Sequence, residues 1–364
     1  MPAGILMKYK IVDTGAENTW RQLLPASATV SGSVEFARIQ EQHSSRVGRL
    51  IVVETDNGAV SYPVLLRPLS ELPFPRFGAP EQYDSVTPEY TGPLNLSVHE
   101  AQGWSAAVHH AFGELGVVSE FMHLHPWNRS EKALVGGVVQ LNREVVWVDT
   151  TLSDEQLWRE HYNHACRKNL KRAAKENVRI FEAASVGDIR EFHRIYCRTM
   201  DRNGARASYY LPVEYFLSIF EQLRAHSRFV LAEWRSQIVA AVLYLHDRDN
   251  VYSYLGGADY NFQEVRPTNA VVENVIRWAR EKGKRRLILG GGYRPDDGIF
   301  RFKASFSPLR ANFYTFQRIH APDAYTTLVE EWREYYQAEP KESYFPAYRS
   351  LAPVVAPALP VSES

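Results

Sequence analysis

The chain has 364 residues, of which 45% are hydrophobic and 12% aromatic, and its formal net charge at pH 7 is zero. This composition predicts a packed globular protein long enough for two domains, and the zero net charge argues against nucleic-acid binding by bulk charge alone. The two cysteines, Cys166 and Cys197, lack the spacing of a metal site or a redox pair, which favours a reduced, cytoplasmic setting.

The first part of the chain predicts a mixed α/β structure. Residues 1–10 hold only a short apolar patch without a secretory signal, and no run of about 18 apolar residues predicts a membrane span. A hairpin is expected at 48–66, around a turn at Asp56-Asn57-Gly58. A turn-rich segment follows at 73–93. The next expected elements are a helix at 97–115 and strands at 117–124 and 144–148.

Ser153, with Gln156 three residues later, predicts a capping box that opens a long helix. This helix carries a row of cations, namely Arg167, Lys168, Lys171, Arg172 and Lys175. Such a run is more often a solvated face than a binding surface, although it could attract phosphate. The elements expected after it are strand 178–183, helices 186–202 and 212–225, strands 229–234, 238–246 and 250–256, helix 268–282, and strands 286–290 and 310–318.

The segment 287–310 carries the most informative local pattern. An apolar, strand-like run stops at three glycines, 290–292, whose spacing is wrong for a nucleotide-binding loop and favours close backbone packing. Beyond them the aromatic residues Phe300, Phe302 and Phe306 share one parity, whereas the cations Arg301 and Lys303 have the other. In an extended strand the rings would lie on one face and the cations on the opposite face, at the edge of an anion-binding site.

The order of elements in the second part resembles the GNAT acyltransferase fold, and several motifs resemble those of the FemAB-like branch. The resemblance covers roughly residues 8–320. The motifs that carry it are 83–84 with 90–93, 121–126, 167–178, 206–210, 252–258 and 290–310. The resemblance implies an α/β protein of two GNAT-like halves, each a mixed, mostly antiparallel twisted sheet flanked by helices.

The same resemblance implies a division of the chain into three parts. Residues 1–149 would form the N-terminal half and contribute a substrate loop. Residues 150–325 would form the catalytic half. Residues 326–364 would hold a C-terminal helix and a Pro-rich, partly disordered tail.

Characterised FemAB-like proteins move an amino acid from aminoacyl-tRNA to an amine of a peptidoglycan precursor, and other members are acyltransferases. This chain lacks the helical hairpin arm of the tRNA-using members. It also lacks the Gln/Arg-x-x-Gly-x-Gly/Ala loop by which GNAT enzymes hold acyl-CoA. Its nearest equivalent is 264–269, where Arg266 and the start of the following helix could receive phosphate. Both acyl-CoA and aminoacyl-tRNA therefore stay open as donors.

Acyl transfer to an amine needs a held carbonyl, donors for the oxyanion and a proton for the leaving group. Tyr252 and Tyr254 share a strand face, and either hydroxyl could supply that proton or could simply pack across strands. Gly256-Gly257 lies where a GNAT sheet exposes backbone N–H groups to the oxyanion. Lys303 corresponds to the family's Phe-Lys pair and could stabilise developing charge.

The resemblance also implies an acceptor-binding set. Arg206 and Tyr210 match the family's acceptor-phosphate contacts and would face the same way in a helical turn. The further substrate-binding candidates are Phe302, Arg310, Tyr83, Asp84 and Tyr90.

Competing sites are less well supported by the sequence. The pairs His109-His110 and His123/His125 lack a nearby acidic or Cys cluster, so no metal is expected, and Cys166 is expected to be a buried thiol. The sequence therefore predicts a cytoplasmic acyltransferase that acts on an amine or hydroxyl of an anionic sugar or amino-acid-derived acceptor in cell-envelope or exopolysaccharide assembly. The alternative is a non-catalytic GNAT pair that binds RNA or an anionic polymer.

Overall fold

The computed structural model describes residues 7–74, 81–88, 90–294 and 296–351. Its central feature is a 12-stranded sheet with the order β1-β2-β3-β4-β5-β12-β6-β11-β10-β9-β8-β7. The strands are β1 (Tyr9–Asp13), β2 (Val47–Thr55), β3 (Gly58–Pro68), β4 (Tyr83–Val86), β5 (Val117–His123), β6 (Val138–Asp149), β7 (Arg179–Glu182), β8 (Ser227–Trp234), β9 (Gln237–His246), β10 (Asn250–Ala258), β11 (Arg286–Gly290) and β12 (Arg310–Ile319).

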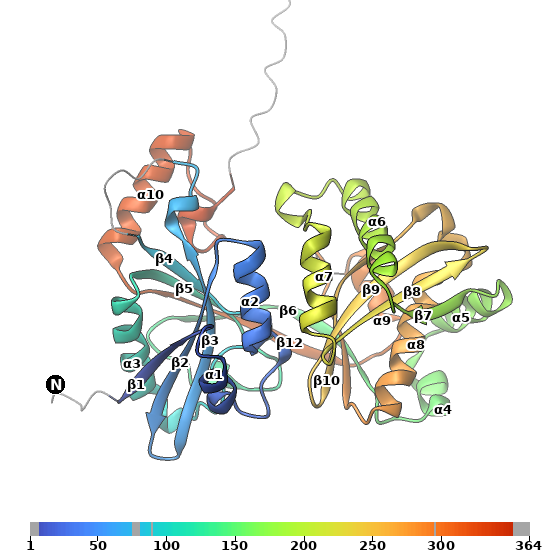
Figure 1. The fold of residues 1–364 in the computed structure, drawn as a ribbon, viewed down its shortest axis with the longest axis horizontal. Helices are drawn as coiled ribbons and strands as arrows, with labels where there is room; N and C mark the ends of the chain where they lie inside the picture. The colour runs from blue at the N-terminus through green and yellow to red at the C-terminus, as the bar shows by residue number, and fades with distance from the viewer. Residues whose placement is uncertain (1–6, 75–80, 89, 295, 352–364) are drawn as a thin grey trace, which may run out of the picture.

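Helices flank both ends of this sheet (Figure 1). They are α1 (Glu17–Leu23), α2 (Val34–His43), α3 (Ala101–Glu114), α4 (Asp154–Gln156), α5 (His164–Lys175), α6 (Val186–Arg202), α7 (Val213–Gln222), α8 (Pro267–Glu281), α9 (Gly298–Ala304) and α10 (Pro322–Tyr336). No helix within the described ranges has both the length and the apolar character needed to cross a membrane.

The sheet consists of two halves with the same pairing pattern. In the N-terminal half-sheet, β1 to β5 followed by β12, only the β4–β5 pair is parallel. In the C-terminal half-sheet, β7 to β11 followed by β6, only the β10–β11 pair is parallel. These findings confirm the α/β class and the two similar, mostly antiparallel halves.

The final strand of each half-sheet comes from the other part of the sequence. β6 follows β5 in the chain but lies beside β11, and β12 follows β11 but lies beside β5. β6 and β12 also pair with each other, so the two half-sheets form one continuous sheet. The division of the chain at residue 149 stays a prediction.

The two halves share part of their apolar core at a junction where α2 and α7 lie side by side (Figure 1). Phe36 and Ile39 of α2 are buried in the same cluster as Phe192 of α6 and Phe216 of α7. The amphipathic helix α6 begins at a capping box formed by Ser185 and Asp188, and its boundaries agree with the predicted helix 186–202.

The long helix predicted from Ser153 is wrong, although its capping box is present. The backbone passes through a π-helical turn at Leu157–His161 and leaves the helix at Tyr162. Asn163 then caps a separate helix, α5, because its side-chain oxygen accepts the N–H of Cys166 at 2.9 Å.

The strand predicted around Phe300 to Phe306 is also wrong, because residues 298–304 form helix α9. Asp297 caps this helix by accepting the N–H of Phe300 at 2.7 Å. The carboxylate also accepts the N–H groups of Tyr293 and Arg294, which shapes the loop before the helix. In a helix Phe302 and Phe306 are four residues apart and face the same side, so both pack on the core of the C-terminal half-sheet.

Residues 83 and 84 of the predicted substrate loop lie in strand β4, and a part in binding substrate stays a prediction. Tyr83 and Asp84 pair with Pro68 and Arg67 of β3. The Pro-rich tail beyond residue 351 lies outside the described residues.

Candidate functional site

Strands β10 and β11 separate part-way along their length, and the candidate site lies where they part. They pair over three positions, from Asn250↔Arg286 to Tyr252↔Ile288. Beyond Tyr252, β10 continues along β9 as far as Ala258, with a bulge at 253–255. In the described chain no further pairing joins it to β11, so the facing edge of 253–258 can offer backbone N–H groups to a ligand.

Gly256 and Gly257 lie on the diverging part of β10. A Cβ atom on Gly256 would lie 2.6 Å from the carbonyl oxygen of Ala241, and one on Gly257 would lie 1.9 Å from Oγ1 of Thr199 in α6. Close packing against β9 and α6 therefore explains why both residues are glycine. Their role in binding a donor stays a prediction.

Lys303 reaches the end of β11 from helix α9. Its Nζ donates a hydrogen bond to the carbonyl oxygen of Gly291 at 2.6 Å. Gly290 has a φ of +81°, and a Cβ atom there would lie 3.3 Å from Lys303 Nζ and 3.5 Å from the Tyr90 hydroxyl. Lys303 and Tyr90 therefore border the same glycine.

Tyr90 connects this lysine to β10. Its ring stacks on that of Tyr252, with centroids 5.5 Å apart and an interplanar angle of 27°, and it meets Phe313 edge-on at 5.5 Å. The structure thus brings together Lys303, Tyr90 and Tyr252, three residues that the sequence proposed from separate motifs.

Tyr252 is the centre of a buried polar network that spans the two half-sheets. Its hydroxyl donates to Asp247 Oδ2 at 2.6 Å and lies 3.0 Å from His125 Nε2. Burial, followed by the charge of Asp247 and the hydrogen bond to it, raises the pKa of Tyr252 well above its ordinary value. The phenolic proton is therefore held by Asp247, and a role for Tyr252 as the proton donor stays a prediction.

His125 is a member of this network that the sequence did not single out as a site residue. Its Nδ1 accepts the backbone N–H of Trp127 at 3.2 Å, so the ring proton lies on Nε2 and is donated to the Tyr252 oxygen. Burial lowers the pKa of His125 to about 3, and the nearby charge of Arg286 adds to that effect. The motif at 121–126 was one signal for this residue, but it did not indicate the partner.

Tyr254 belongs to a second group of side chains at the junction of the half-sheets. Its hydroxyl lies 2.8 Å from that of Tyr215 in α7, which in turn accepts Gln40 Nε2 of α2 at 3.0 Å. Gln40 Oε1 accepts Arg46 Nη1 at 2.9 Å. A chain of hydrogen bonds therefore runs from Arg46 through Gln40 and Tyr215 to Tyr254.

Arg46 is a candidate that the sequence analysis missed. Burial lowers the pKa of its guanidinium, and the like charge of Arg67 lowers it further. Among the residues that the structure describes, it forms no ion pair, so its charge at the junction is balanced by no carboxylate in contact with it.

Two predicted substrate-binding residues beside Lys303 have structural partners. Phe302 packs edge-on against Phe306, with ring centroids 5.6 Å apart. Arg310 Nη1 donates to the carbonyl oxygens of Ser307 and Leu309, each at 2.9 Å, and its guanidinium lies 5.1 Å from the centroid of the Phe300 ring. Contact with a substrate stays a prediction for both.

Asp84 is buried and accepts hydrogen bonds from two guanidinium groups, those of Arg67 and Arg349. This arrangement ties strands β3 and β4 to the segment that follows α10. The carboxylate therefore has a structural role, and a role in binding substrate stays a prediction for Asp84 and for Tyr83.

Arg206 and Tyr210 flank a short 3₁₀ turn, Ala207–Tyr209, rather than lying within a helical turn. Both side chains are exposed, and the Tyr210 hydroxyl donates to Asp201 Oδ1 at 2.9 Å.

Arg266 is also exposed and immediately precedes α8, whose first residue is Pro267. It therefore lies at the positive end of a helix of 15 residues.

The basic row on α5 is only partly available to a ligand. Arg167 donates to the carbonyl oxygens of Trp158 and Tyr162, and Arg172 pairs with Glu176 at 2.9 Å.

Cys166 on the same helix is fully buried, and burial raises the pKa of its thiol to about 12. In the described part of the chain, no group of three or more His, Cys, Asp or Glu side chains could hold a metal ion.

Comparison with known proteins identifies the fold. Residues 162–304 match the family described as "Acetyltransferase (GNAT) domain". The crystal structure of FemX superposes with a TM-score of 0.67 at 11% identity, covering 88% of this chain and 99% of that one. The chain has the fold of FemX. The predicted resemblance to FemAB-like GNAT proteins is therefore confirmed at the level of the fold.

Two other structures share this FemX-like fold. A conserved protein of unknown function from Bacteroides thetaiotaomicron has a TM-score of 0.56 at 12% identity, covering 86% of this chain and 99% of its own. The C-terminal domain of a putative lysylphosphatidylglycerol synthetase from Agrobacterium fabrum has a TM-score of 0.55 at 14% identity, covering 87% of this chain and 95% of that one. No curated protein matches the chain at a significant level.

Proposed function

We propose that this FemX-like protein is an acyltransferase that moves an acyl or aminoacyl group to an amine, or a hydroxyl, of an anionic acceptor. The observation that carries the proposal is the convergence of Lys303, Tyr90 and Tyr252 where β10 and β11 part. Lys303 and Tyr252 lie within the segment that matches the GNAT domain, whereas Tyr90 lies outside it. A lysine ammonium and backbone N–H groups are donors of the kind that stabilise the oxyanion formed during acyl transfer.

Each group has a proposed role in this reaction. The free edge of β10 near Gly256-Gly257 supplies N–H donors to the carbonyl oxygen. Lys303, fixed by the Gly291 carbonyl, stabilises negative charge on the tetrahedral intermediate or holds the acceptor. Tyr254 is the better candidate for proton transfer to the leaving group, because the proton of Tyr252 is held by Asp247.

We assign the acceptor's anionic group to the junction of the half-sheets. Arg46 supports this assignment, because a half-buried guanidinium without a carboxylate partner among the described residues is costly unless an anion completes it. Arg206 remains a second candidate for the same group. An envelope or exopolysaccharide precursor is consistent with this chemistry, and the similarity to the Agrobacterium lysylphosphatidylglycerol synthetase domain supports such an acceptor.

The donor is either acyl-CoA or aminoacyl-tRNA. Both carry phosphate, and Arg266 with the N-terminus of α8 is the proposed phosphate contact. The match to a GNAT acetyltransferase domain favours acyl-CoA, whereas the likeness to FemX keeps aminoacyl-tRNA open.

The test is a transfer assay with each donor in turn. Purified protein is incubated with pools of acyl-CoA or with charged tRNA, together with nucleotide sugars as acceptors, and release of CoA or free tRNA is followed. We expect release from one donor. Lys303→Ala should lower the rate by about 10²-fold, as is typical when a charge-stabilising donor is lost. Lys282→Ala, which removes an exposed lysine at the C-terminal end of α8, should leave the rate unchanged.

Release of neither product with any acceptor would contradict the transferase assignment. Salt-sensitive RNA binding without turnover, weakened by substitution of Lys168 and Lys171, would instead support the binding module.

A further inference from the structure

A cavity of about 360 Å³ lies between the segment that joins α1 to α2 and the chain beside β8, β9 and β11 in the C-terminal half-sheet. One wall is formed by residues 24–35, between α1 and α2, and the other by residues 225–226, 246–248 and 284. Lys284 lies two residues before Arg286, the first residue of β11. Lys303 borders Gly290, the last residue of the same strand. The cavity and the transfer site are therefore at opposite ends of β11.

The wall of the cavity is apolar on one side and cationic on the other. The apolar lining residues include Leu24, Pro25, Ala28, Val30 and Ala225. The cations are Arg248 and Lys284. Lys284 Nζ is held in place by the carbonyl oxygens of Asp247, at 2.5 Å, and Arg248, at 3.3 Å.

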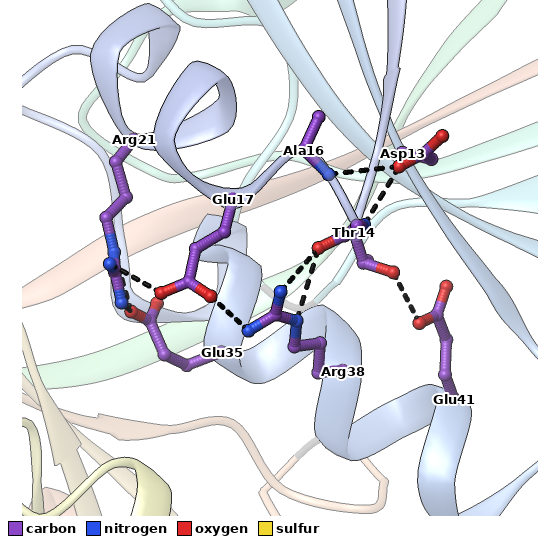
Figure 2. A network of polar contacts seen from close by, with 9 residues as sticks. Asp13, Thr14, Ala16, Glu17, Arg21, Glu35, Arg38 and Glu41 are labelled. Carbon is purple, nitrogen blue, oxygen red and sulfur yellow. Dashed lines mark hydrogen bonds and ion pairs between the residues drawn. The ribbon is translucent and has the colours of Figure 1, made fainter.

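The two cations have no acidic partner among the residues that the structure describes, although two carboxylates also line the cavity. Glu35 is paired with Arg21 at 2.5 Å, and Arg21 also contacts Glu17 (Figure 2). Asp247 accepts the Tyr252 hydroxyl through Oδ2, and the N–H groups of Asp249 and Asn250 through Oδ1. Both carboxylates are therefore engaged elsewhere, and the positive charge of Arg248 and Lys284 is left for a ligand.

We propose that this cavity binds a small organic anion, in which a carboxylate or phosphate group contacts Arg248 and Lys284 and a short aliphatic body fills the apolar side. The volume is within the range of pockets that hold small molecules. Because its walls come from both half-sheets, an occupant stabilises their junction, and the stabilisation grows with the logarithm of the ligand concentration once that exceeds the Kd. The proposal gives no ligand contact to the residues assigned a role in acyl transfer, although Asp247 lines the cavity and also accepts the Tyr252 hydroxyl.

The experiment measures binding of chosen probes to the full-length protein by calorimetry and thermal unfolding. Butyrate and butyl phosphate each combine an anionic group, a carboxylate or a phosphate, with a short aliphatic chain. Butylamine has the same body with the opposite charge, and inorganic phosphate has the anion alone. We expect saturable binding of at least one of the first two probes, with butylamine at least tenfold weaker, and phosphate weaker than butyl phosphate.

Two substitutions locate the site. Arg248→Gln should weaken binding by about tenfold or more, because a charge-assisted contact is lost. Ala225→Trp should abolish it by filling the cavity, and both positions are exposed, so folding is retained. The matched controls Arg224→Gln and Ala184→Trp alter the same residue types at a different surface hollow and should leave binding unchanged.

Four results would overturn the proposal. They are no saturable binding of either anionic probe, equal binding of butylamine, equal loss in the control variants, and binding of butyl phosphate that is saturable but no tighter than that of inorganic phosphate, because the apolar wall would then have no role.

Discussion

The His125 side chain is held in a single protonation state by its two contacts. Nδ1 must accept the N–H of Trp127, and Nε2 must donate to Tyr252, whose own proton goes to Asp247. A second proton on the ring would have to displace the backbone contact at Nδ1, in a place that water reaches poorly because the residue is 4% exposed. The neutral imidazole is thus part of the connection between the half-sheets.

This geometry predicts a pH dependence of the free energy of unfolding. The pKa of His125 is lowered from 6.5 to about 3 in the folded protein, so the unfolded chain takes up the proton first as the pH falls. The stabilisation from this group is complete above pH 6.5 and is lost between pH 6.5 and 3, by about 5 kcal/mol. His125→Gln, which keeps a donor and an acceptor without titrating, should flatten that decline.

Denaturant unfolding at several pH values between 7 and 4 measures the difference. His99→Gln, at an exposed position, should keep the wild-type slope. Identical slopes in the wild type and the His125 variant would show that the imidazole titrates normally.

The sequence proposed Lys303, Tyr90 and Tyr252 because each lies in a motif with a chemical pattern of its own, and the structure places the three close together, while their roles stay predictions. The sequence did not single out His125 or Arg46. Their significance comes from partners that are distant in sequence (Tyr252 is 127 positions from His125), and a local pattern carries no such information.

At the scale of elements, α9 shows where local patterns mislead. The alternation of aromatic residues and cations at 300–303 fits a strand by period, yet a helix forms because Asp297 satisfies the N–H groups at its start. A segment of seven residues is too short for its period to separate the two structures. The longer elements, such as α6 and α8, were predicted within one or two residues, since their apolar faces repeat over several turns.

Asp297 should therefore control the order of Lys303. Asp297→Ala removes the acceptor for Phe300 and for the loop residues Tyr293 and Arg294. Amide hydrogen exchange in residues 298–303 should become about tenfold faster, as expected for loss of a helix cap. The control Glu221→Ala, at an exposed carboxylate of α7, should leave exchange in residues 298–303 unchanged. Equal acceleration in both variants would refute a specific role for the cap.

At the scale of the whole molecule, the exchange of β6 and β12 ties the half-sheets together. The sequence predicted a strand in the region of β6 and another in that of β12. It did not predict the neighbouring strands, because a pattern of alternating residues does not specify which strand lies alongside. As a result β12, at 310–319, contributes Phe316 to a core formed mainly by β2, β3 and α3.

Phe316→Ala should accordingly destabilise the N-terminal half-sheet, although the residue comes from the far end of the chain. A cavity of this kind costs about 3–5 kcal/mol, since Phe316 is 1% exposed. Hydrogen exchange should accelerate in β2, β3 and α3. The matched variant Phe216→Ala, also fully buried, should instead accelerate exchange in α6 and α7. Faster exchange in α6 and α7 from the Phe316 variant, without change in β2 and β3, would contradict this assignment.

The strand exchange also has a consequence for biosynthesis. While the chain leaves the ribosome, β1 to β5 are complete long before β12 exists, so the edge of β5 that will receive β12 stays open. An open strand edge is a site for mispairing and aggregation. The nascent protein therefore exposes this edge until residue 319 has been added and the last strand closes the gap.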